Sequence, residues 1–259
     1  RDVEKNVRTL KRNDMKKVIV SVAFLIFFIS CKQEKKETST AVVEKIEMPE
    51  SEWEILFDGT SLDQWKEFKT NGVSEAWKIK GEALVYTPPN EGEEKKNHDL
   101  VTKKEYTDFV LSLDWKISEA GNSGVFWGVS EDEKFGTGYQ TGPEIQILDN
   151  DKHPDAKAGT THQAGALYDM VSPAEDATKP IGEWNTMLIT VDHKENRGNV
   201  VLNGIEMVTF PVQGEEWDAM VADSKFAGWE GFGKFTTGKI GLQDHGNIVA
   251  FRNIKIKQL

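Results

Sequence analysis

Short segments in which apolar and polar residues alternate limit the fold of this chain more than any other feature of its sequence. In "DFVLSLDWKI" the apolar residues recur at every second position, and they are Phe109, Leu111, Leu113, Trp115 and Ile117. Side chains of a β-strand point to opposite faces in turn, so this period of two predicts a strand with one buried face. Other short segments with strand character are "AWKIKGEALVYTP", "SGVFWGVS", "EIQIL", "GALYDMV", "TMLITVDH" and "GKIGLQDHG".

Turn residues connect these segments, and the sequence shows no long helical pattern. Asn203-Gly204 stands between two apolar runs in "NVVLNGIEMVTF", which is a strong short signal for a β-hairpin. A break in the alternation between Phe251 and Ile254 predicts a bulge near Arg252-Asn253, and one short helix is expected around Glu215 to Lys225. Many short strands without interleaved long helices predict an all-β fold of two packed antiparallel sheets, with a groove on one concave face.

Charge and cysteine content exclude several classes of protein. The chain has 32 basic and 43 acidic residues and a net charge of −11. Nucleic-acid binding requires basic surface that meets phosphates, so this balance opposes it. A single cysteine, Cys31, cannot form an intrachain disulfide or a thiolate metal cluster.

The setting of Cys31 predicts a lipoprotein. Two lysines follow Met15, an apolar run extends from Val18 to Ile29, and Ser30 precedes the cysteine. The run has about the length of a signal-peptide core and is short for a membrane-spanning helix. The small residue before Cys31 resembles a bacterial lipobox, although Phe28 stands where leucine is more usual. A signal anchor with an incidental cysteine is the alternative.

From this pattern we expect residues 1–14 to be an over-extended start, 15–30 a signal peptide, and 31–50 a tether that begins at a lipidated Cys31. The tether has few large apolar groups and cannot bury enough surface to fold alone. Residues 51–259 then form the folded domain. The expected location is the bacterial cell envelope, where the lipid anchors the protein to the membrane on the periplasmic side or at the surface of the outer membrane.

The segment "GPEIQILDN" carries polar residues that a strand does not need for folding. Glu144 and Gln146 share one face because side chains alternate, and Asp149 points to the other face unless a bulge intervenes. With a bulge, two carboxyl groups line one groove, and paired carboxyls in unlike environments can divide acid and base roles. Alternatively, Asp149-Asn150-Asp151 is a turn and Glu144 pairs with a buried basic group.

Further polar residues lie in apolar or glycine-rich settings. They are Asn122 in "NSGVFW", His162, Tyr168 and Asp169 in "THQAGALYD", Gln243, Asp244 and His245 in "GLQDHGN", and Arg252 in "FRNI". A single histidine in a loop is more commonly solvated than catalytic, and convergence in space is not visible in a sequence. The spacings do not match a metalloprotease helix, a nucleophile elbow or a phosphate-binding loop.

Several blocks resemble, in the same order, one bacterial family. The blocks are "ILFDGTSLDQW", "NSGVFWGV", "GPEIQILDN", "GALYD", "GEWNTMLITV", "LNG" and "GKIGLQDHGNIVAFRNIKIKQL". They cover nearly everything from Trp53 to Leu259 and resemble the 3-keto-disaccharide hydrolases, which implies a concanavalin A-like jelly-roll sandwich. "EIQILD" is also similar to the Glu-x-Asp-x-x-Glu strand of jelly-roll endo-glucanases. In this chain Gln146 stands where those enzymes have the central Asp, and Asp149 stands where they have the second Glu. These differences argue against direct retaining hydrolysis with Asp149 as the acid/base.

The resemblance implies cleavage of glycosides that are already oxidised at carbon 3, so a small oxidised saccharide is the expected substrate. A ketone acidifies the C–H bond on carbon 2. A base can remove that proton, the group on the anomeric carbon can then be expelled, and water can add afterwards. Such a site needs a base, a stabiliser for the enolate oxygen and an acid for the leaving group.

The candidate catalytic residues are Glu144, His162 and His245, and the candidate substrate-binding residues are Asn122, Gln146, Tyr168, Asp244, Arg252 and Trp127. For the individual roles, the candidates are Glu144 or His162 as the base, Arg252 or His245 as the partner of the oxyanion, and Tyr168 or Asp244 as the acid. A divalent metal such as calcium could also hold the oxyanion, since Glu, Asp, Gln and His side chains are metal ligands. The sequence shows no ligand set for it.

Two other functions stay open at this point. A non-catalytic carbohydrate-binding domain would stack sugars on tryptophans, for which the candidates are Trp127, Trp184 and Trp229. An ordinary glycoside hydrolase would act without a prior ketone. A catalyst needs a converging acid, base and electrophile, so the deciding observation is whether Glu144, His162 and His245 meet in one pocket.

Overall fold

The computed structural model describes residues 52–90 and 96–259. The predicted start, signal peptide and tether, within residues 1–50, and the predicted lipidation of Cys31 lie outside these ranges. Within the described ranges, no helix has both the length and the apolar character that a membrane span requires.

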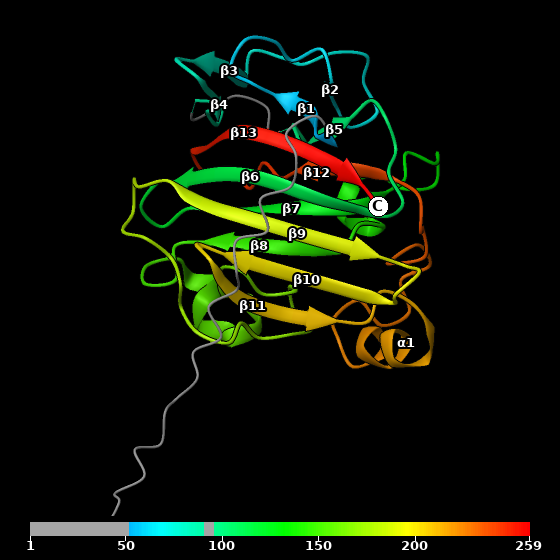
Figure 1. Cartoon of the computed structure of the whole chain (residues 1–259). Coiled ribbons are helices and arrows are strands. Elements are labelled where there is room, and N and C mark those ends of the chain that lie inside the picture. Colours follow the sequence, from blue (N-terminus) through cyan, green and yellow to red (C-terminus); the bar gives the residue numbers. More distant parts are fainter. Residues whose placement is uncertain (1–51, 91–95) are drawn as a thin grey trace, which may run out of the picture. The chain divides into compact units, whose positions relative to one another are not determined.

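Two antiparallel β-sheets form the described domain (Figure 1). One sheet contains β1 (Glu54–Phe57), β3 (Trp77–Lys80), β4 (Ala83–Tyr86), β6 (Phe109–Ile117), β9 (Asn185–Asp192), β10 (Arg197–Leu202), β11 (Ile205–Phe210) and β13 (Val249–Gln258). Its order is β11-β10-β9-β6-β13-β4-β3, with β1 also paired to β13. The other sheet contains β2 (Trp65–Glu67), β5 (Leu100–Thr102), β7 (Asn122–Val129), β8 (Glu144–Leu148) and β12 (Lys239–Leu242). Its order is β2-β5-β12-β7-β8.

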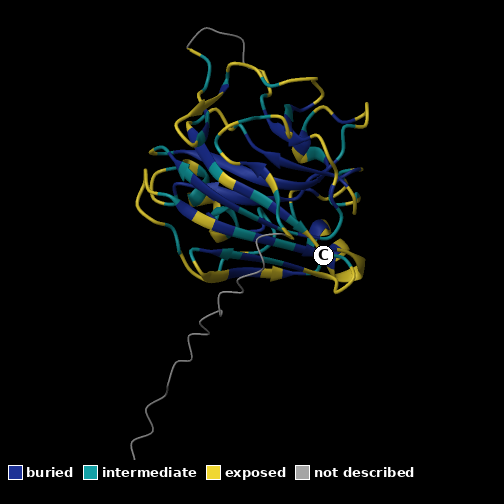
Figure 2. Cartoon of the chain, turned by 45° about the horizontal axis from the view of Figure 1, so that its top comes forward, coloured by how far each residue is buried: buried dark blue, intermediate teal, exposed yellow. Residues whose placement is uncertain are grey.

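Apolar side chains from the facing sides of the two sheets form the core. Phe109, Leu111, Leu113, Trp115 and Ile117 of β6 are all buried, as their spacing predicted, and they share one hydrophobic cluster with apolar residues of β7 and β8. Burying a large apolar side chain stabilises the fold by about 1.5–3 kcal/mol. Figure 2 shows that buried residues concentrate in the strands and exposed ones in the connecting segments. The predicted all-β sandwich of two antiparallel sheets is therefore confirmed.

Three local predictions are also confirmed. Asn203 and Gly204 have φ angles of 52° and 86° and turn the chain from β10 into β11. The short helix is α1 (Gly214–Ala222). The pairing of β13 with β6 shifts register after Arg252, and Asn253 has a φ of 52°, so the predicted bulge is present.

The segment "GALYDMV", residues 165–171, is not the strand that its sequence predicted. Asp169 has a φ of 60°, and the backbone N–H of Val171 donates to the carbonyl of Leu167, so the chain reverses direction there. Only isolated bridges form, one between Leu167 and Ile145 and one between Leu167 and Val171. The nearby connections contain the short 3-10 helices η2 (Gly138–Gln140), η3 (Pro154–Ala158) and η4 (Thr160–His162).

Candidate active site

A cavity of about 280 Å³ opens over β7 and β8, and we call it the Glu144 pocket. Its lining residues come from segments far apart in the sequence, and they are Asn122, Tyr139, Gly142, Glu144, Gln146, Tyr168, Lys225, Phe226, Trp229, Gln243 and His245. Five of the candidate catalytic and substrate-binding residues therefore meet here, namely Asn122, Glu144, Gln146, Tyr168 and His245. Gln243 and Trp229, which the sequence also singled out, join them.

Glu144 is packed tightly at the beginning of β8. A Cβ atom at Gly124 of the neighbouring strand β7 would overlap Oε1 of Glu144, so glycine supplies the space that the carboxyl group occupies. The neighbours Ile145 and Ile147 are fully buried on the core side and hold the strand in place. No ion pair in the described part of the chain involves Glu144. The alternative in which Glu144 pairs with a buried basic group is therefore not what the structure shows there.

Burial raises the pKa of Glu144 to about 8, because the charged form loses its hydration. The Lys225 ammonium and the Gln243 amide act in the opposite direction, whereas the carboxylates of Asp99 and Asp155 raise the pKa further. At neutral pH the carboxyl group of Glu144 is consequently protonated. In that state it is a proton donor.

The pKa of His245 is lowered, so its imidazole ring is neutral at the same pH. It lies at the rim of the pocket, exposed on one side, and burial of its other side lowers its pKa below the ordinary value of 6.5. The nearby His153, whose ring centre is 5.9 Å away, and Lys225 lower the pKa of His245 further, while Asp155 opposes them. A neutral imidazole has a free lone pair and can accept a proton.

Three buried amide side chains leave polar atoms unpaired in this pocket. Asn122 Oδ1, Gln146 Nε2 and Gln243 Oε1 have no hydrogen-bond partner in the described structure, and each residue is less than 9% exposed. Buried polar atoms without partners are costly, so a cluster of them indicates a site that a polar ligand or water completes. Two acceptors and one donor suit a ligand with hydroxyl groups, since a hydroxyl can both donate and accept.

Tyr168 reaches the pocket because its segment runs along β8. The backbone N–H of Tyr168 donates to the carbonyl of Glu144 over 3.0 Å, and the N–H of Gln146 donates to the carbonyl of Ala166 over 3.1 Å. Burial and the hydrogen bond to Asp155 raise the pKa of Tyr168, so its hydroxyl keeps its proton. That hydroxyl donates to Oδ2 of Asp155 over 2.9 Å.

His162 does not line the pocket and lies behind Tyr168. Its Nδ1 is 2.9 Å from Oδ1 of Asp155, and its Nε2 is 2.9 Å from Oδ1 of Asp169. Both ring nitrogens are thus directed at carboxylate oxygens, and neither is directed into the cavity. His162 therefore helps to position Asp155, and Asp155 in turn holds the hydroxyl of Tyr168.

Two further acidic residues bind backbone groups instead of lining the cavity. Asp244 follows Gln243, but its Oδ2 accepts from the N–H of His98. Asp149 accepts from three backbone N–H groups, those of Ala120, Asp151 and Lys152. The register of β7 with β8 continues without a shift. Asp149 thus belongs to a turn, as in the alternative that predicted a turn at Asp149-Asn150-Asp151. No bulge in these strands returns Asp149 to the face of Glu144.

Trp127 and Arg252 lie elsewhere in the fold. Trp127 is buried in the core and stacks on Phe210 with ring centres 5.7 Å apart. Arg252 is on β13, in the other sheet, and lines a different cavity. Neither residue contacts the Glu144 pocket.

Comparison with known proteins decides the family. Residues 52–257 match the family described as the 3-keto-alpha-glucoside-1,2-lyase-like domain. The chain belongs to this family. It is 33% identical over 231 residues to a 3-keto-disaccharide hydrolase of Bacteroides thetaiotaomicron, with 79% of this chain and 77% of that protein covered.

Solved structures agree with the family assignment. A crystal structure of a candidate glycosyl hydrolase from Parabacteroides distasonis is similar at 31% identity with a TM-score of 0.74, covering 82% of this chain and 98% of that one. A second candidate glycosyl hydrolase from the same organism gives 28% identity and a TM-score of 0.60, with 80% and 99% covered. The chain is therefore a carbohydrate-active enzyme of the 3-keto-alpha-glucoside-1,2-lyase-like family, and the resemblance found in its sequence is confirmed.

Three lining residues of this family member, Lys225, Phe226 and Tyr139, were not singled out by sequence reasoning. The ammonium of Lys225 lies 4.0 Å from the ring centre of Tyr168 and is the basic group of the pocket lining. Trp229 has its ring centre 5.3 Å from Phe226 and 6.1 Å from Tyr139, so aromatic rings surround the mouth. The density of aromatic residues and glycines in "KFAGWEGFGKF" is the signal that could have indicated them.

A divalent metal has no ligand set in the part of the family domain that the structure describes. Calcium takes six to eight oxygen ligands, and no group of three or more His, Cys, Asp or Glu side chains is placed to hold a metal ion within residues 52–90 and 96–259. The residues of the Glu144 pocket do not fit such an ion, and no step below depends on one.

Proposed function

We propose that this protein cleaves the glycosidic bond of 3-keto-glycosides by elimination across carbons 1 and 2, followed by addition of water. The observation that carries the proposal is one pocket that holds a protonated carboxyl, Glu144, beside a neutral imidazole, His245. Groups whose environments push their pKa values apart in this way are suited to acid and base roles. The family match and the relative named 3-keto-disaccharide hydrolase support the substrate class.

In the first step His245 acts as the base. Its lone pair takes the proton from carbon 2, and the electron pair of that C–H bond moves toward the ketone oxygen on carbon 3. The prior ketone makes this possible, because it spreads the negative charge onto oxygen as an enediolate. This assignment replaces Glu144 or His162 as the base, because Glu144 holds its proton and both nitrogens of His162 are occupied.

In the second step Glu144 acts as the acid. The enediolate electrons form the double bond between carbons 1 and 2, the bond from carbon 1 to the leaving oxygen breaks, and Glu144 protonates that oxygen. Water then adds across the double bond, so that the net reaction is hydrolysis. The hydroxyl of Tyr168 donates its proton to Asp155, so toward the substrate it can act only as a hydrogen-bond acceptor beside Glu144.

Lys225 and the unpaired amides supply the remaining requirement, which is a stabiliser for the enediolate oxygen. A positive charge and preorganised donors are most effective where negative charge develops in a partly dry site. Gln146 Nε2 is such a donor without a partner in the described structure, and the acceptors Asn122 Oδ1 and Gln243 Oε1 suit the substrate hydroxyls. The aromatic mouth around Trp229 can pack on the C–H face of the leaving group.

An ordinary retaining hydrolase would need two carboxyl groups about 5–5.5 Å apart. The lining of the Glu144 pocket contains one carboxyl group among the described residues, and Asp149 is bound to backbone N–H groups. This geometry favours elimination over direct displacement. A binding module, in turn, has no need for a buried carboxyl and a neutral imidazole with opposite pKa shifts.

The test is an assay of the purified protein with matched glucosides and their 3-keto forms. We expect release of the leaving group from the keto forms alone, slower turnover when carbon 2 carries deuterium, and a transient conjugated enone absorbance. Equal cleavage of the plain glucosides would identify an ordinary hydrolase. Binding without cleavage of any keto form would identify a carbohydrate-binding module.

We also propose that the protein is a lipoprotein of the bacterial cell envelope, anchored through Cys31. The sequence around Cys31 supports this proposal. In the native host, Cys31→Ser should leave the precursor unprocessed or release the protein from membranes, measured by fractionation and by incorporation of labelled lipid. A parent protein that incorporates no lipid at Cys31 would show that the anchor is absent.

A further inference from the structure

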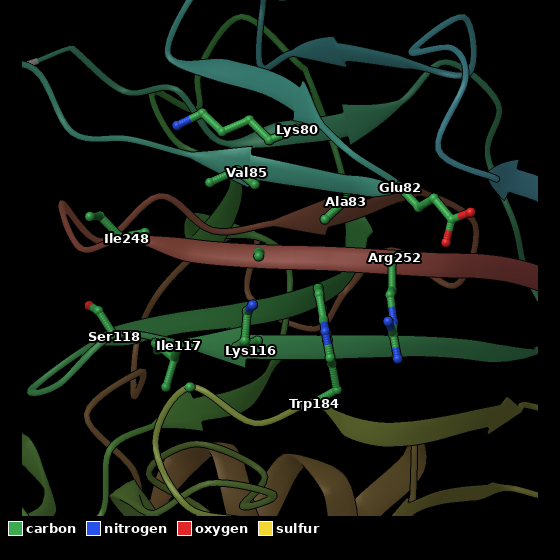
Figure 3. A pocket seen from close by; sticks show the side chains of 12 residues that line it. Lys80, Glu82, Ala83, Val85, Lys116, Ile117, Ser118, Trp184, Ile248 and Arg252 are labelled. Atoms are coloured by element: carbon green, nitrogen blue, oxygen red, sulfur yellow. The ribbon is translucent and has the colours of Figure 1, made fainter.

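A second and larger cavity lies on the outer face of the eight-stranded sheet, on strands other than those of the Glu144 pocket. Its volume is about 540 Å³, and we call it the Arg252 pocket. Figure 3 shows its side chains above β4, β13 and β6, with the connection before β9 closing one side. The proposed function uses none of these residues.

Small side chains on adjacent strands make the floor of the Arg252 pocket. Ala250 of β13 pairs with Val85 of β4 on one side and with Lys116 of β6 on the other. Ala83 lies two positions before Val85 and therefore faces the same way. Short side chains flanked by long ones leave a hollow, and in Figure 3 Lys80 and Lys116 lie on opposite sides of it.

Trp184 holds two cations in place at this hollow. The Lys116 ammonium is 4.8 Å and the Arg252 guanidinium carbon 4.2 Å from the Trp184 ring centre. Figure 3 shows the ring standing between the two side chains. Both faces of the indole are therefore covered by cations, and Trp184 is not a free platform on which a sugar could stack.

A buried carboxylate orients Arg252. Oδ2 of Asp114, which is 8% exposed, accepts from Nε of Arg252 over 3.1 Å and from Nδ2 of Asn253 over 2.8 Å. Oδ1 of the same carboxylate accepts from the Thr186 hydroxyl over 2.7 Å. The bulge at Asn253 aims Arg252, which is a recurrent use of bulges. No hydrogen bond or ion pair in the described structure uses the two terminal nitrogens of Arg252.

The charge of this pocket contrasts with that of the chain. The protein carries a net charge of −11. The Arg252 pocket nevertheless has three basic lining residues, Lys80, Lys116 and Arg252, and one acidic residue, Glu82. Lys116 makes no ion pair among the described residues. This is a local surplus of positive charge with unused hydrogen-bond donors.

We propose that the Arg252 pocket binds a uronic acid residue of an oligosaccharide. The paired terminal nitrogens of a guanidinium match the two oxygens of a planar carboxylate, which a lysine cannot do. Lys116 adds attraction, and the methyl groups of Ala83, Val85 and Ala250 contact the C–H face of the sugar ring. The site would hold an acidic glycan on the eight-stranded sheet, whereas the Glu144 pocket lies on the five-stranded sheet. The choice of a sugar rests on the family, and the choice of a carboxylate rests on the geometry.

The experiment measures binding by isothermal titration calorimetry with the purified full chain. The probes are an oligogalacturonate of three residues, a neutral oligosaccharide of the same length, and vesicles that contain an anionic phospholipid. We expect that, of these three probes, only the oligogalacturonate binds saturably. Because no turnover is measured, failure of this proposal and failure of the proposed reaction are distinguishable.

Variants locate the site. Arg252→Gln and Lys116→Gln should each weaken oligogalacturonate binding by about 10-fold or more, since each removes a charged donor. Arg252→Lys keeps the charge but loses the paired donors, so it should also weaken binding. Lys234→Gln is the matched control, because Lys234 is an exposed lysine before β12, outside the lining, and the charge change is the same. It should bind as the parent does. Lys116→Gln breaks no hydrogen bond in the described structure, so it keeps the test valid if Arg252→Gln impairs folding.

Several results would overturn the proposal. These are absence of saturable oligogalacturonate binding, equal binding of the neutral oligosaccharide, binding of the vesicles alone, and equal losses in Lys234→Gln and Lys116→Gln. Parent-like binding by Arg252→Lys would show that charge alone acts and that no paired carboxylate contact exists.

Discussion

Glu144→Gln is expected to lower kcat/KM for a 3-keto-glycoside by about 100-fold or more, which is the range for loss of general acid catalysis. Glutamine has nearly the same shape but no proton to give to the leaving oxygen. A substrate whose leaving group is a nitrophenolate needs little protonation. For that substrate the loss should be much smaller, and this contrast separates an acid from a base at position 144.

The same substitution should preserve the fold. Burial raises the pKa of Glu144 to about 8, above the value of 4.5 expected in the unfolded chain. Between these values the folded protein retains a proton that the unfolded chain has released, so this group opposes folding increasingly as the pH rises. Glutamine never ionises and removes this penalty, so the Tm of the variant at pH 7 should equal or exceed that of the parent.

Glu215→Gln is the matched control for Glu144→Gln, because it removes one carboxylate from the exposed first turn of α1. It should keep parental activity. Full specific activity of Glu144→Gln together with a lowered Tm would mean that the carboxyl group is structural. An equal loss with the nitrophenolate substrate would remove Glu144 from the role of acid.

His245→Gln is expected to lower kcat/KM by about 100-fold or more and to change the pH profile. In the parent protein kcat/KM should rise as His245 loses its proton, below pH 6.5 because its pKa is lowered. It should fall near pH 8 as Glu144 loses its proton. His245→Gln should remove the rise at low pH, and Glu144→Gln should remove the fall at high pH.

A neighbouring histidine provides a second check on this assignment. His153 lowers the pKa of His245 through its charge. His153→Gln should therefore move the rising limb of the profile to higher pH while the falling limb stays near pH 8. If the rising limb of the pH profile survives in His245→Gln, that limb reports the titration of another group, and His245 is not the base.

The architecture could be predicted from the sequence because strands depend on local alternation. The period of two in Phe109 to Ile117, the Asn203-Gly204 turn and the break at Arg252-Asn253 all act over a few residues, and the structure contains each of them. Residues 165–171 were mistaken for a strand because a left-handed residue at Asp169 reverses the chain. Apolar character alone does not reveal such a reversal.

The site could be predicted only in part, because sheet membership is not a local property. His245 and Arg252 are seven positions apart in the sequence, yet β12 ends before His245 in one sheet and β13 carries Arg252 in the other. Glu144 stood out because a carboxylate among isoleucines is unusual. Lys225 and Tyr139 did not, because a lysine and a tyrosine in polar connections look like ordinary surface residues.

The segment that carries Tyr168 also covers the open edge of a sheet. β8 is the last strand of its sheet, and an open strand edge is a template for pairing with other chains. The hydrogen bonds from Gly165 to Gln146, from Gln146 to Ala166 and from Tyr168 to Glu144 occupy that edge. The covering of this edge and the position of Glu144 thus depend on the same few hydrogen bonds. A substitution that loosens this segment would expose the edge of β8 to pairing with other chains and would also disturb the Glu144 pocket.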